Sequence, residues 1–495
     1  MARTASEAPA GAGRQRWKAL WVTLVTGFMT LLDVTIVAVA LPSLQHGLNA
    51  SAASVQWVVS GYALSFALAL VPAGRLGDAV GRRRIFLAAL AAFVVCSAAA
   101  GAAPTAGLLI AARVAQGAAA GCLAPQNSAL IQQMFHGAER GRAFGLLGAT
   151  VGVSSAVGPV VGGLVLTLAS GPEGWRWIFY VNVPIGLTAL LLGARLLPRV
   201  APGRGSRRLD LPGVGLLGAG VLALMLPLVF AEDGGVARLW WLFPAGAALL
   251  VVFARWEHRV TARGGQPLLD PRLATGTRGY LPGATLGALY FVGFSGIWIV
   301  FALFFQNGLG YSPLSSGLVV TPFALGSATA AVVAGRLVER FGRLLTVYGL
   351  VTVMAGLGTT ALLLGRAPTG ALPWFAAPAL LVAGLGSGCV ISPNVTMTLR
   401  DVPVRMAGAA GGALQTGQRL GSAVGTALLP GLFYLVLNAT GGDHRAAVSV
   451  AVGAASATML AAFAVAVADR RRDRHDGTAA DGRESAAGTA HAGRP

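Results

Sequence analysis

The sequence predicts an all-α polytopic membrane protein. Hydrophobic residues fill 55% of its 495 positions and charged residues only 11%, far from the composition of a water-soluble domain. Apolar stretches of about 20 residues, the length that a helix needs to cross a bilayer, recur along the chain. Polar and apolar residues do not alternate with the period of two that half-buried strands show. Because helices satisfy their own backbone groups in lipid, the spans are predicted to be helical.

Fourteen apolar stretches are candidate spans. An even number places both termini on the same side of the membrane. The stretches begin near Ala19, Val55, Ile85, Ala106, Ala143, Trp177, Leu211, Arg238, Leu281, Leu314, Leu344, Leu372, Ala407 and Ala446.

The basic residues predict the orientation of these spans. Of the 37 Lys and Arg residues, 31 lie in the terminal segments or in every second loop, and four lie in the opposite loops. Since Lys and Arg near span ends accumulate on the cytoplasmic side, both termini are predicted to be cytoplasmic. One lysine against 36 arginines, with abundant Ala and Gly, indicates a GC-rich bacterial gene, and therefore the bacterial plasma (inner) membrane.

Several function classes are excluded. The net charge of +19 does not indicate nucleic acid, because the basic residues are spread over short loops without interleaved aromatic residues. Lys18 is the only lysine and is not part of a phosphate-binding loop, so no nucleotide is expected. The histidines lack metal-ligand spacing and the three cysteines are isolated, so neither a metal nor a disulfide is expected.

A weak repeat divides the stretches into two groups. The segment 74–82 returns as 335–343, and Gly121-Cys122 returns as Gly388-Cys389 at a similar offset. The first repeat relates spans two and three to spans ten and eleven, which fits two six-helix bundles with two inserted spans and a substrate site between the bundles. The predicted order is a cytoplasmic N-terminus (1–18), an N-terminal bundle (19–197), a basic linker with the inserted spans (198–280), a C-terminal bundle (281–468) and a flexible cytoplasmic tail (469–495).

One acidic residue, Asp33, lies inside a membrane-length stretch. A carboxylate at that depth costs a few kcal/mol and marks an ion, proton or substrate path. Thr26, Thr30 and Asp33 have helical spacing and form one polar stripe. Arg113 lies in the fourth stretch. Asp33 buried among apolar groups would carry a proton, whereas Asp33 beside Arg113 would stay ionised. Two roles stay open for the pair, proton coupling and a static ion pair that fixes helix packing.

Several segments carry signatures of one known family. The turn at 74–84 resembles the loop signature Gly-x-Leu-x-Asp-x-x-Gly-Arg-Arg of the major facilitator superfamily. Segment 32–42 resembles the first-span signature of its fourteen-span drug:proton antiporter branch, with Ala38 at the position of the usual Asn. Further resemblances to this branch are Arg113 with Gln116-Gly117 in span four, Gly152, Gly158-Pro159 and Gly162-Gly163 in span five, and Trp175 to Phe179 followed by Asn182-Val183-Pro184.

The resemblance implies that the turn at 74–84, called here the gate turn, closes the cytoplasmic side through charged contacts. The alternative is that these charges only secure the topology and a tight turn. The candidate gate residues are Gly74, Asp78, Gly81, Arg82 and Arg83, with Glu339 and Arg343 in the repeat.

The fifth span is rich in small residues. Small residues four positions apart allow helices to pack closely in lipid, and a proline removes a backbone donor and kinks the helix. A tight helix pair is one interpretation, and the resemblance implies a seam that favours exchange over leak. The residues concerned are Gly152, Gly158, Pro159, Gly162 and Gly163.

Aromatic and amide residues of several spans are candidates for the substrate cavity. Aromatic faces suit flat hydrophobic or cationic ligands, although most such side chains pack in cores or face lipid. The candidates are Thr30, Trp57, Tyr62, Tyr290, Trp298, Phe305, Gln306, Asn307, Asn394, Gln415, Gln418 and Arg419.

The resemblance and the residues together predict a proton-coupled exporter of hydrophobic or amphipathic small molecules, such as drugs or antibiotics. Its expected partners are the small-molecule substrate, protons and the lipid bilayer, and the proton gradient replaces any cofactor. No enzymatic activity is expected. One alternative is a transporter of the same fold for one defined metabolite. An alternative from another class is a non-transporting membrane sensor or scaffold.

Overall fold

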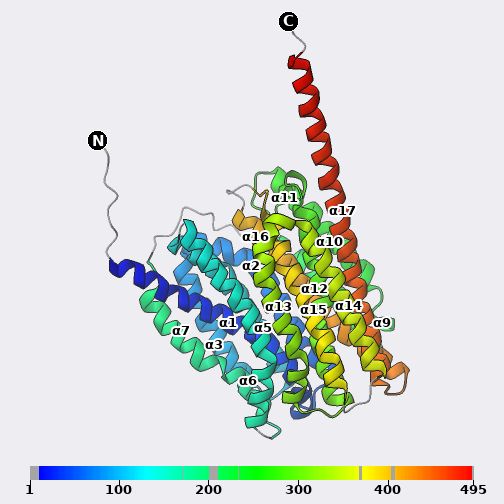
Figure 1. Cartoon of the computed structure of the whole chain (residues 1–495). Helices are drawn as coiled ribbons and strands as arrows, with labels where there is room; N and C mark the ends of the chain where they lie inside the picture. Colours follow the sequence, from blue (N-terminus) through cyan, green and yellow to red (C-terminus); the bar gives the residue numbers. More distant parts are fainter. Residues whose placement is uncertain are drawn as a thin grey trace.

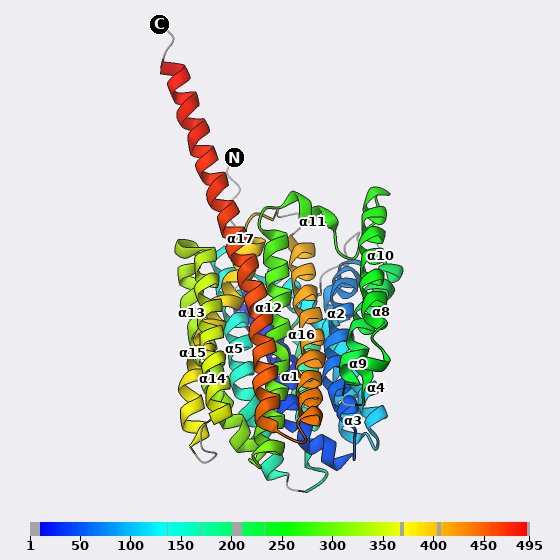
Figure 2. The same ribbon diagram turned by 90° about the vertical axis from the view of Figure 1, so that its right-hand side faces the viewer.

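The computed structural model describes residues 10–135, 137–169, 171–199, 210–231, 233–366, 371–402 and 407–492. All regular elements in these ranges are helices, which stand side by side in one body (Figures 1 and 2). Their bounds are α1 (Ala10–Gly47), α2 (Ala52–Val80), α3 (Arg82–Ala102), α4 (Ala106–Met134), α5 (Gly137–Leu168), η1 (Gly174–Arg176), α6 (Trp177–Tyr180), α7 (Asn182–Leu196), α8 (Leu211–Val229), α9 (Gly235–Arg238), α10 (Leu242–Ala262), α11 (Pro271–Gly276), α12 (Tyr280–Leu303), η2 (Phe304–Gly308), α13 (Pro313–Phe341), α14 (Arg343–Arg366), α15 (Leu372–Leu399), α16 (Ala407–Ala439) and α17 (His444–Ala492).

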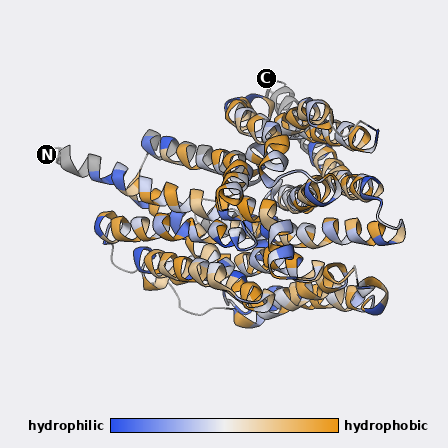
Figure 3. Cartoon of the chain, turned by 90° about the horizontal axis from the view of Figure 1, so that it is seen from below, coloured by the Kyte–Doolittle hydropathy of each residue, from blue (hydrophilic) through white to orange (hydrophobic). Residues whose placement is uncertain are grey.

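Among the described residues, 12 helical segments are long and apolar enough to cross a membrane. Hydrophobic residues, in orange, recur along the helices seen from below, between pale and blue segments (Figure 3). The other two predicted spans correspond to α5 and α10. In α5 only Val157–Leu168 qualifies, as a shorter apolar helix, and α10 ends in the charged run Arg255 to Arg259.

Six helices pack in the same pattern at each end of the chain. In the first bundle, α2 and α3 pack on α4, while α1 packs on α5 and α7. In the second, α13 and α14 pack on α15, while α12 packs on α16 and α17. The bundles meet where α2 packs on α16 and α5 packs on α13, two pairs that are equivalent under the repeat.

The repeated segments 74–82 and 335–343 form equivalent turns. Gly81 (φ 113°) separates α2 from α3, and Gly342 (φ 52°) separates α13 from α14. Glycine adopts positive φ without the steric cost that a Cβ would add. The shared glycine therefore lets each pair of helices reverse direction within one residue.

The apolar core joins the bundles more closely at one end. Both termini lie on the upper side of Figure 1, here called the terminal end, and the opposite side is called the far end. One cluster joins Ile36 to Leu44 of α1 to Phe301 and Phe304 of the second bundle, at the far end. A separate cluster, which includes Leu24 of α1, lies within the first bundle toward the terminal end. The shared core thus closes the far end.

The inserted helices cover the seam between the bundles. Leu217, Val221 and Met225 of α8 share a buried cluster with Leu64 of α2 and Ala427 of α16. Helix α10 packs against α8 on the outside (Figure 2). This third cluster, called here the seam cluster, attaches the inserted pair to both bundles.

The segment after Asp469, expected to be a flexible tail, continues α17 as a helix to Ala492 that projects from the bundle (Figures 1 and 2). Its many Ala and Arg residues are good helix formers, which favours this continuation over an irregular chain. Asp469 itself is 6% exposed, and its carboxyl group pairs with Arg343.

Candidate functional site

Asp33 and Arg113 form a buried ion pair. Asp33 lies midway along α1 and Arg113 in the first half of α4, and each is 0% exposed. Arg113 Nη1 lies 2.5 Å from Asp33 Oδ2. Buried charges are tolerated only when they are paired and hydrogen-bonded, so the pair requires the neighbours described next.

Polar groups from four further positions complete the pair. The Asp33 Oδ1 atom accepts hydrogen bonds from Asn182 Nδ2 (2.8 Å) and Gln116 Nε2 (3.2 Å). Arg113 donates from Nη1 to Gln116 Oε1 (2.7 Å) and from Nε to the Val58 carbonyl (3.0 Å). Gln116 Nε2 also contacts Ser97 Oγ at 2.6 Å. Helices α1, α2, α3, α4 and α7 therefore meet at one polar cluster, called here the ion-pair cluster.

Aromatic rings shield the guanidinium group. Its Cζ atom lies 4.1 Å from the centroid of Tyr62 and 5.7 Å from that of Phe179. The Tyr62 hydroxyl donates to the carbonyl of Thr30 (3.4 Å), and the Thr30 hydroxyl donates to carbonyls of its own helix. Thr30 and Tyr62, both expected in the substrate cavity, thus belong to the wall of the ion-pair cluster.

The arginines of the gate turn contact the carbonyl ends of helices. Arg82 Nη1 donates to Ala129 O (3.0 Å) near the end of α4, and Arg83 Nη2 donates to Ala194 O (2.5 Å) in the last turn of α7. Cations stabilise helix C-termini because the helix dipole is negative there. Gly74 lies in α2 near its end, and Gly81 separates α2 from α3. The side chains of Asp78 and Glu339 lie outside the described residues.

Arg343 lies in a second buried polar cluster. Its Nε atom is 2.8 Å from Asp469 Oδ2, and it donates to Asn394 Oδ1 (2.9 Å) and to Gly279 O (2.8 Å). Asn394 in turn donates to Gly283 O (2.9 Å) and is 1% exposed. The place of Asn394 in the substrate cavity stays a prediction, and in this structure its side chain satisfies Arg343.

Glycines of α5 allow close contacts on two sides. A Cβ at Gly158 would overlap the Thr35 side chain of α1, and one at Gly162 would lie 3.0 Å from Ile36. Gly163 faces the backbone of Leu314, and the carbonyl of Pro159 faces Gly317 of α13. Helix α5 therefore packs tightly between α1 of its own bundle and α13 of the other. The surroundings of Gly152 lie outside the described residues.

Four aromatic side chains of α12 and α13 contact one another in a row, the first pair stacked and the other pairs edge-to-face. Tyr290 and Phe294 are 5.5 Å apart, Phe294 and Trp298 are 5.6 Å apart, and Trp298 lies 4.8 Å from Phe323 between ring centroids. The Tyr290 hydroxyl donates to Ser387 Oγ at 2.7 Å. Phe294 and Trp298 are only partly buried. This set is called here the aromatic ladder.

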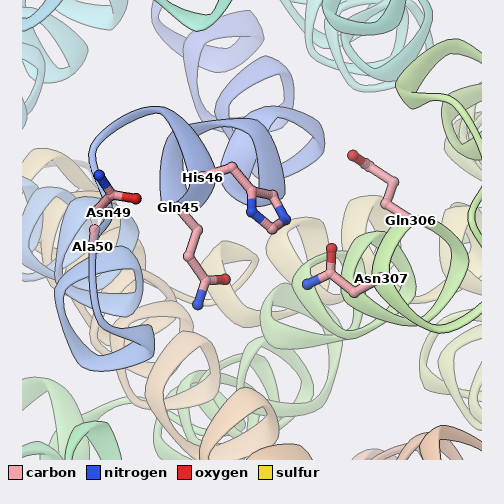
Figure 4. A pocket seen from close by; sticks show the side chains of 6 residues that line it. All are labelled: Gln45, His46, Asn49, Ala50, Gln306 and Asn307. Atoms are coloured by element: carbon pink, nitrogen blue, oxygen red, sulfur yellow. The ribbon is translucent and has the colours of Figure 1, made fainter. Parts of the chain in front are cut away.

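Residues at the far end line a polar cavity of about 670 Å³ (Figure 4). Gln306 also donates to the Val39 carbonyl at 2.8 Å and so joins the two bundles. Phe305, one residue earlier, is fully buried in the core. The lining residues are Gln45, His46, Asn49, Ala50, Gln306 and Asn307.

The remaining cavity candidates lie near the seam between α2 and α16. Trp57 packs on the seam cluster, Gln418 is partly buried beside Gly287, and Gln415 is exposed. The Arg419 guanidinium of α16 lies 4.4 Å from the ring centroid of Phe66 on α2. The candidates thus occupy several places: the ion-pair cluster, the Arg343 cluster, the aromatic ladder, the polar cavity and this seam.

Comparison with known protein families identifies the family of the chain. The model of the Major Facilitator Superfamily matches residues 23–426. The chain belongs to the Major Facilitator Superfamily. It is therefore a transporter rather than an enzyme, and the 12 apolar helices among its described residues, with its bacterial relatives, make it a multi-pass bacterial membrane protein.

Relatives in this superfamily include antibiotic exporters. The chain is 37% identical over 457 residues to the "Probable actinorhodin transporter" of Streptomyces coelicolor, covering 90% of this chain and 78% of that protein. It is 39% identical over 430 residues to the "Puromycin resistance protein pur8" of Streptomyces alboniger (86% and 83%). It is 34% identical over 464 residues to the "Methylenomycin A resistance protein" of Streptomyces coelicolor (91% and 92%).

Solved structures of the superfamily share the fold. A D-xylose-proton symporter superposes with a TM-score of 0.61 at 17% identity, covering 90% of this chain and 97% of that one. A bacterial homologue of the human lysosomal transporter Spinster, in an inward-facing and unoccupied conformation, superposes with a TM-score of 0.61 at 15% identity (92% and 95%).

Three residues of the ion-pair cluster were not predicted as site residues. Gln116 lies three positions after Arg113, on the same face of α4, a spacing that brings side chains together. Ser97 of α3 and Asn182 of α7 are isolated polar residues in apolar helices, and each is 0% exposed. Since buried polar groups need partners, both were recognisable as candidates, but their partners, Gln116 for Ser97 and Asp33 for Asn182, were not.

Proposed function

We propose that this protein exports a hydrophobic or amphipathic antibiotic from the cytoplasm in exchange for protons. The relatives, a probable actinorhodin transporter and resistance proteins for puromycin and methylenomycin A, support the substrate class. We also propose that it belongs to the fourteen-span drug:proton antiporter branch. In that arrangement α5 and α10 complete the spans, and the terminal end is cytoplasmic because most basic residues lie there.

The ion-pair cluster is the observation that carries the proposal of proton coupling. A proton that binds Asp33 neutralises the carboxylate and removes its attraction for Arg113. The guanidinium keeps the Gln116 and Val58 acceptors and the Tyr62 ring. Helices α1 and α4 are then no longer tied by charge and can shift relative to each other. Loss of the proton restores the pair, so the protonation of one residue selects between two packings.

The proton gradient supplies enough free energy for export. One charge crossing about 100 mV contributes about 2.3 kcal/mol, and one pH unit adds about 1.4 kcal/mol. Together they sustain a gradient of several hundredfold for a neutral substrate, since about 1.4 kcal/mol corresponds to a factor of ten.

Substrate and gate have separate places in this proposal. The aromatic ladder offers stacking surfaces to a flat apolar ligand between the bundles. The gate turn, with Gly74, Asp78, Gly81, Arg82 and Arg83, closes the cytoplasmic side when the bundles approach there. Glu339 and Arg343 belong to the equivalent turn of the second bundle.

Everted vesicles test the proposal. Parent vesicles energised with a proton gradient should take up antibiotics and dyes, and collapse of the gradient should stop uptake. Asp33→Asn should insert and fold but lose proton-driven uptake, because the amide cannot exchange a proton. The matched control is Asp233→Asn, an exposed acid that should retain parent activity.

Proton-driven uptake by Asp33→Asn at the parent rate would contradict the role of Asp33. Uptake of a single compound in the panel would favour the defined-metabolite alternative.

A further inference from the structure

Two carboxyl groups meet where the inserted helices approach the gate turn. Asp210 caps the start of α8, and Glu257 lies in the charged end of α10, beyond its apolar stretch. Helix α10 rises toward the terminal end beside α8 (Figure 2). Glu257 is 2% exposed, an unusual state for a carboxyl group.

Each carboxyl group has one oxygen held by N–H donors. Asp210 Oδ1 accepts from Gly213 N (3.0 Å) and Trp256 Nε1 (2.9 Å), and Glu257 Oε2 accepts from Leu269 N (2.6 Å). The other two oxygens, Asp210 Oδ2 and Glu257 Oε1, have no hydrogen-bond donor in the part of the chain that the structure describes. Both lie against the Cα of Gly213, on the side where a Cβ would project.

Two acceptor oxygens that share one small space require a proton between them. An ionised carboxylate only accepts hydrogen bonds, whereas a protonated carboxyl group can also donate one. If both groups were ionised, two like charges would lie side by side with Arg75 as the one cation that offsets them among the described residues. One proton removes the repulsion and supplies the missing hydrogen bond.

We propose that Asp210 and Glu257 form a second proton-binding site, whose bound proton keeps the connection 266–270 docked on Arg75 of the gate turn. The contacts on the other side of that connection are made by the Arg75 guanidinium, which donates to Gln266 O (2.9 Å) and to Pro267 O. Between these anchors, Leu268 is buried in the seam cluster. The connection is thus held by Glu257 from α10 and by Arg75 from α2.

The electrostatic surroundings place the proton on Glu257. Burial, followed by the hydrogen bond with Asp210, raises the pKa of Glu257 to about 8. Burial acts to raise the pKa of Asp210, but hydrogen bonds from Glu257, from Trp256 and from the Gly213 and Leu268 amides together outweigh burial, so this pKa is lowered.

Few other charges face the pair. Arg75 of α2 faces both carboxyl groups and favours their ionised forms, and Asp270 acts on Arg75 from the same connection. On α10 itself, Arg255, His258 and Arg259 are exposed. Loss of the proton leaves two adjacent negative charges, which should separate and release Leu269 and Leu268. The inserted pair then loses one of its attachments to the gate-turn end of α2.

Hydrogen exchange of the peptide 264–272 in the full-length protein tests this site without measuring transport. The parent should exchange several-fold faster than Glu257→Gln at pH 9, and equally fast at pH 6.5, because the amide replaces the shared proton permanently. Because the parent and the variant are compared at the same pH, the intrinsic pH dependence of the amide exchange rate affects both equally. Asp210→Asn should also lose the pH dependence, and His258→Gln, an exposed titratable neighbour on α10, should keep it. Equal exchange by the parent and both amide variants at both pH values would overturn the proposal.

Thermal unfolding gives a second measurement if an amide variant folds poorly. A raised folded-state pKa means that the stabilisation from Glu257 is fully present below its unfolded pKa, near 4.3, and is lost as pH rises through about 8. The unfolding temperature of the parent should therefore fall by several degrees between pH 6 and pH 9 relative to Glu257→Gln. The absence of this difference would contradict a shared proton. Neither measurement depends on whether Asp33 couples protons to export.

Discussion

At the scale of single residues, the ion-pair cluster depends on the shape of Arg113 as well as on its charge. One guanidinium contacts Asp33, Gln116 and the Val58 carbonyl while its face lies on the Tyr62 ring. A planar fork of donors can make these contacts together, whereas an ammonium group is a point charge at the end of a shorter reach.

Arg113→Lys should therefore destabilise the protein although it conserves the charge. Loss of one partner of a buried pair costs about 3–5 kcal/mol, and the lysine retains only part of the contacts. We expect a lower unfolding temperature and at least a tenfold loss of proton-driven export, measured by thermal unfolding in detergent and by vesicle uptake. The control is Arg366→Lys, an exposed arginine that should behave as the parent. Parent-like unfolding of Arg113→Lys would show that charge alone is sufficient.

The residues of this cluster were only partly predictable. Asp33 and Arg113 were recognisable because charges in apolar stretches are costly, but 80 positions separate them in sequence. Their contact depends on how α1 packs on α4, which hydropathy does not encode. Asn394 shows a second limit: an amide in an apolar span indicates a polar neighbour, but the sequence does not say that this neighbour is Arg343.

At the scale of elements, the spacing of small residues predicted that α5 packs closely, but not against which helices. The structure places α1 on one side and α13 on the other. The position of α8 over the seam between α2 and α16 was likewise not predictable, because a uniformly apolar helix does not specify which of its faces is buried.

Gly158→Ala should disturb the contact between α5 and α1. The added methyl group would overlap Thr35, and overpacking a tight contact costs about 1–3 kcal/mol. We expect the unfolding temperature to fall by several degrees and export to fall about tenfold. Gly453→Ala is the matched control, since Gly453 is helical and exposed with no atom within 4 Å of the added Cβ. That variant should be neutral or slightly more stable, because alanine favours helix over glycine by about 1 kcal/mol. Identical behaviour of the two variants would contradict a tight seam.

At the scale of the whole molecule, the internal repeat predicted the two bundles but not their relative position. Equivalent helices make equivalent contacts in each bundle, which follows from the repeated sequence. The far end is closed by a core that includes α1 and α12, while a separate core lies in the first bundle toward the terminal end. Alternating access requires that the same sequence adopt two relative positions of the bundles. Sequence patterns therefore cannot predict which of the two positions the structure has.

If the far end opens during export, a covalent link across it should stop transport. Gln306 Nε2 contacts the Val39 carbonyl at 2.8 Å and joins η2 to α1 of the other bundle. In a background without Cys96, Cys122 and Cys389, the pair Val39→Cys and Gln306→Cys should export before treatment with a short thiol cross-linker. It should lose at least nine-tenths of its export rate after treatment.

The control for this experiment links two helices of one bundle. Ser295 of α12 and Ser422 of α16 have their Oγ atoms 2.8 Å apart, and conversion of both to cysteine changes little else. Cross-linking this pair should leave export unchanged, because rigid-body motion of the bundles does not separate it. Export that continues at the untreated rate in the 39/306 pair, despite complete cross-linking, would mean that the far end does not open there. Inhibition by both links would mean that motion within the C-terminal bundle, rather than between the bundles, limits transport.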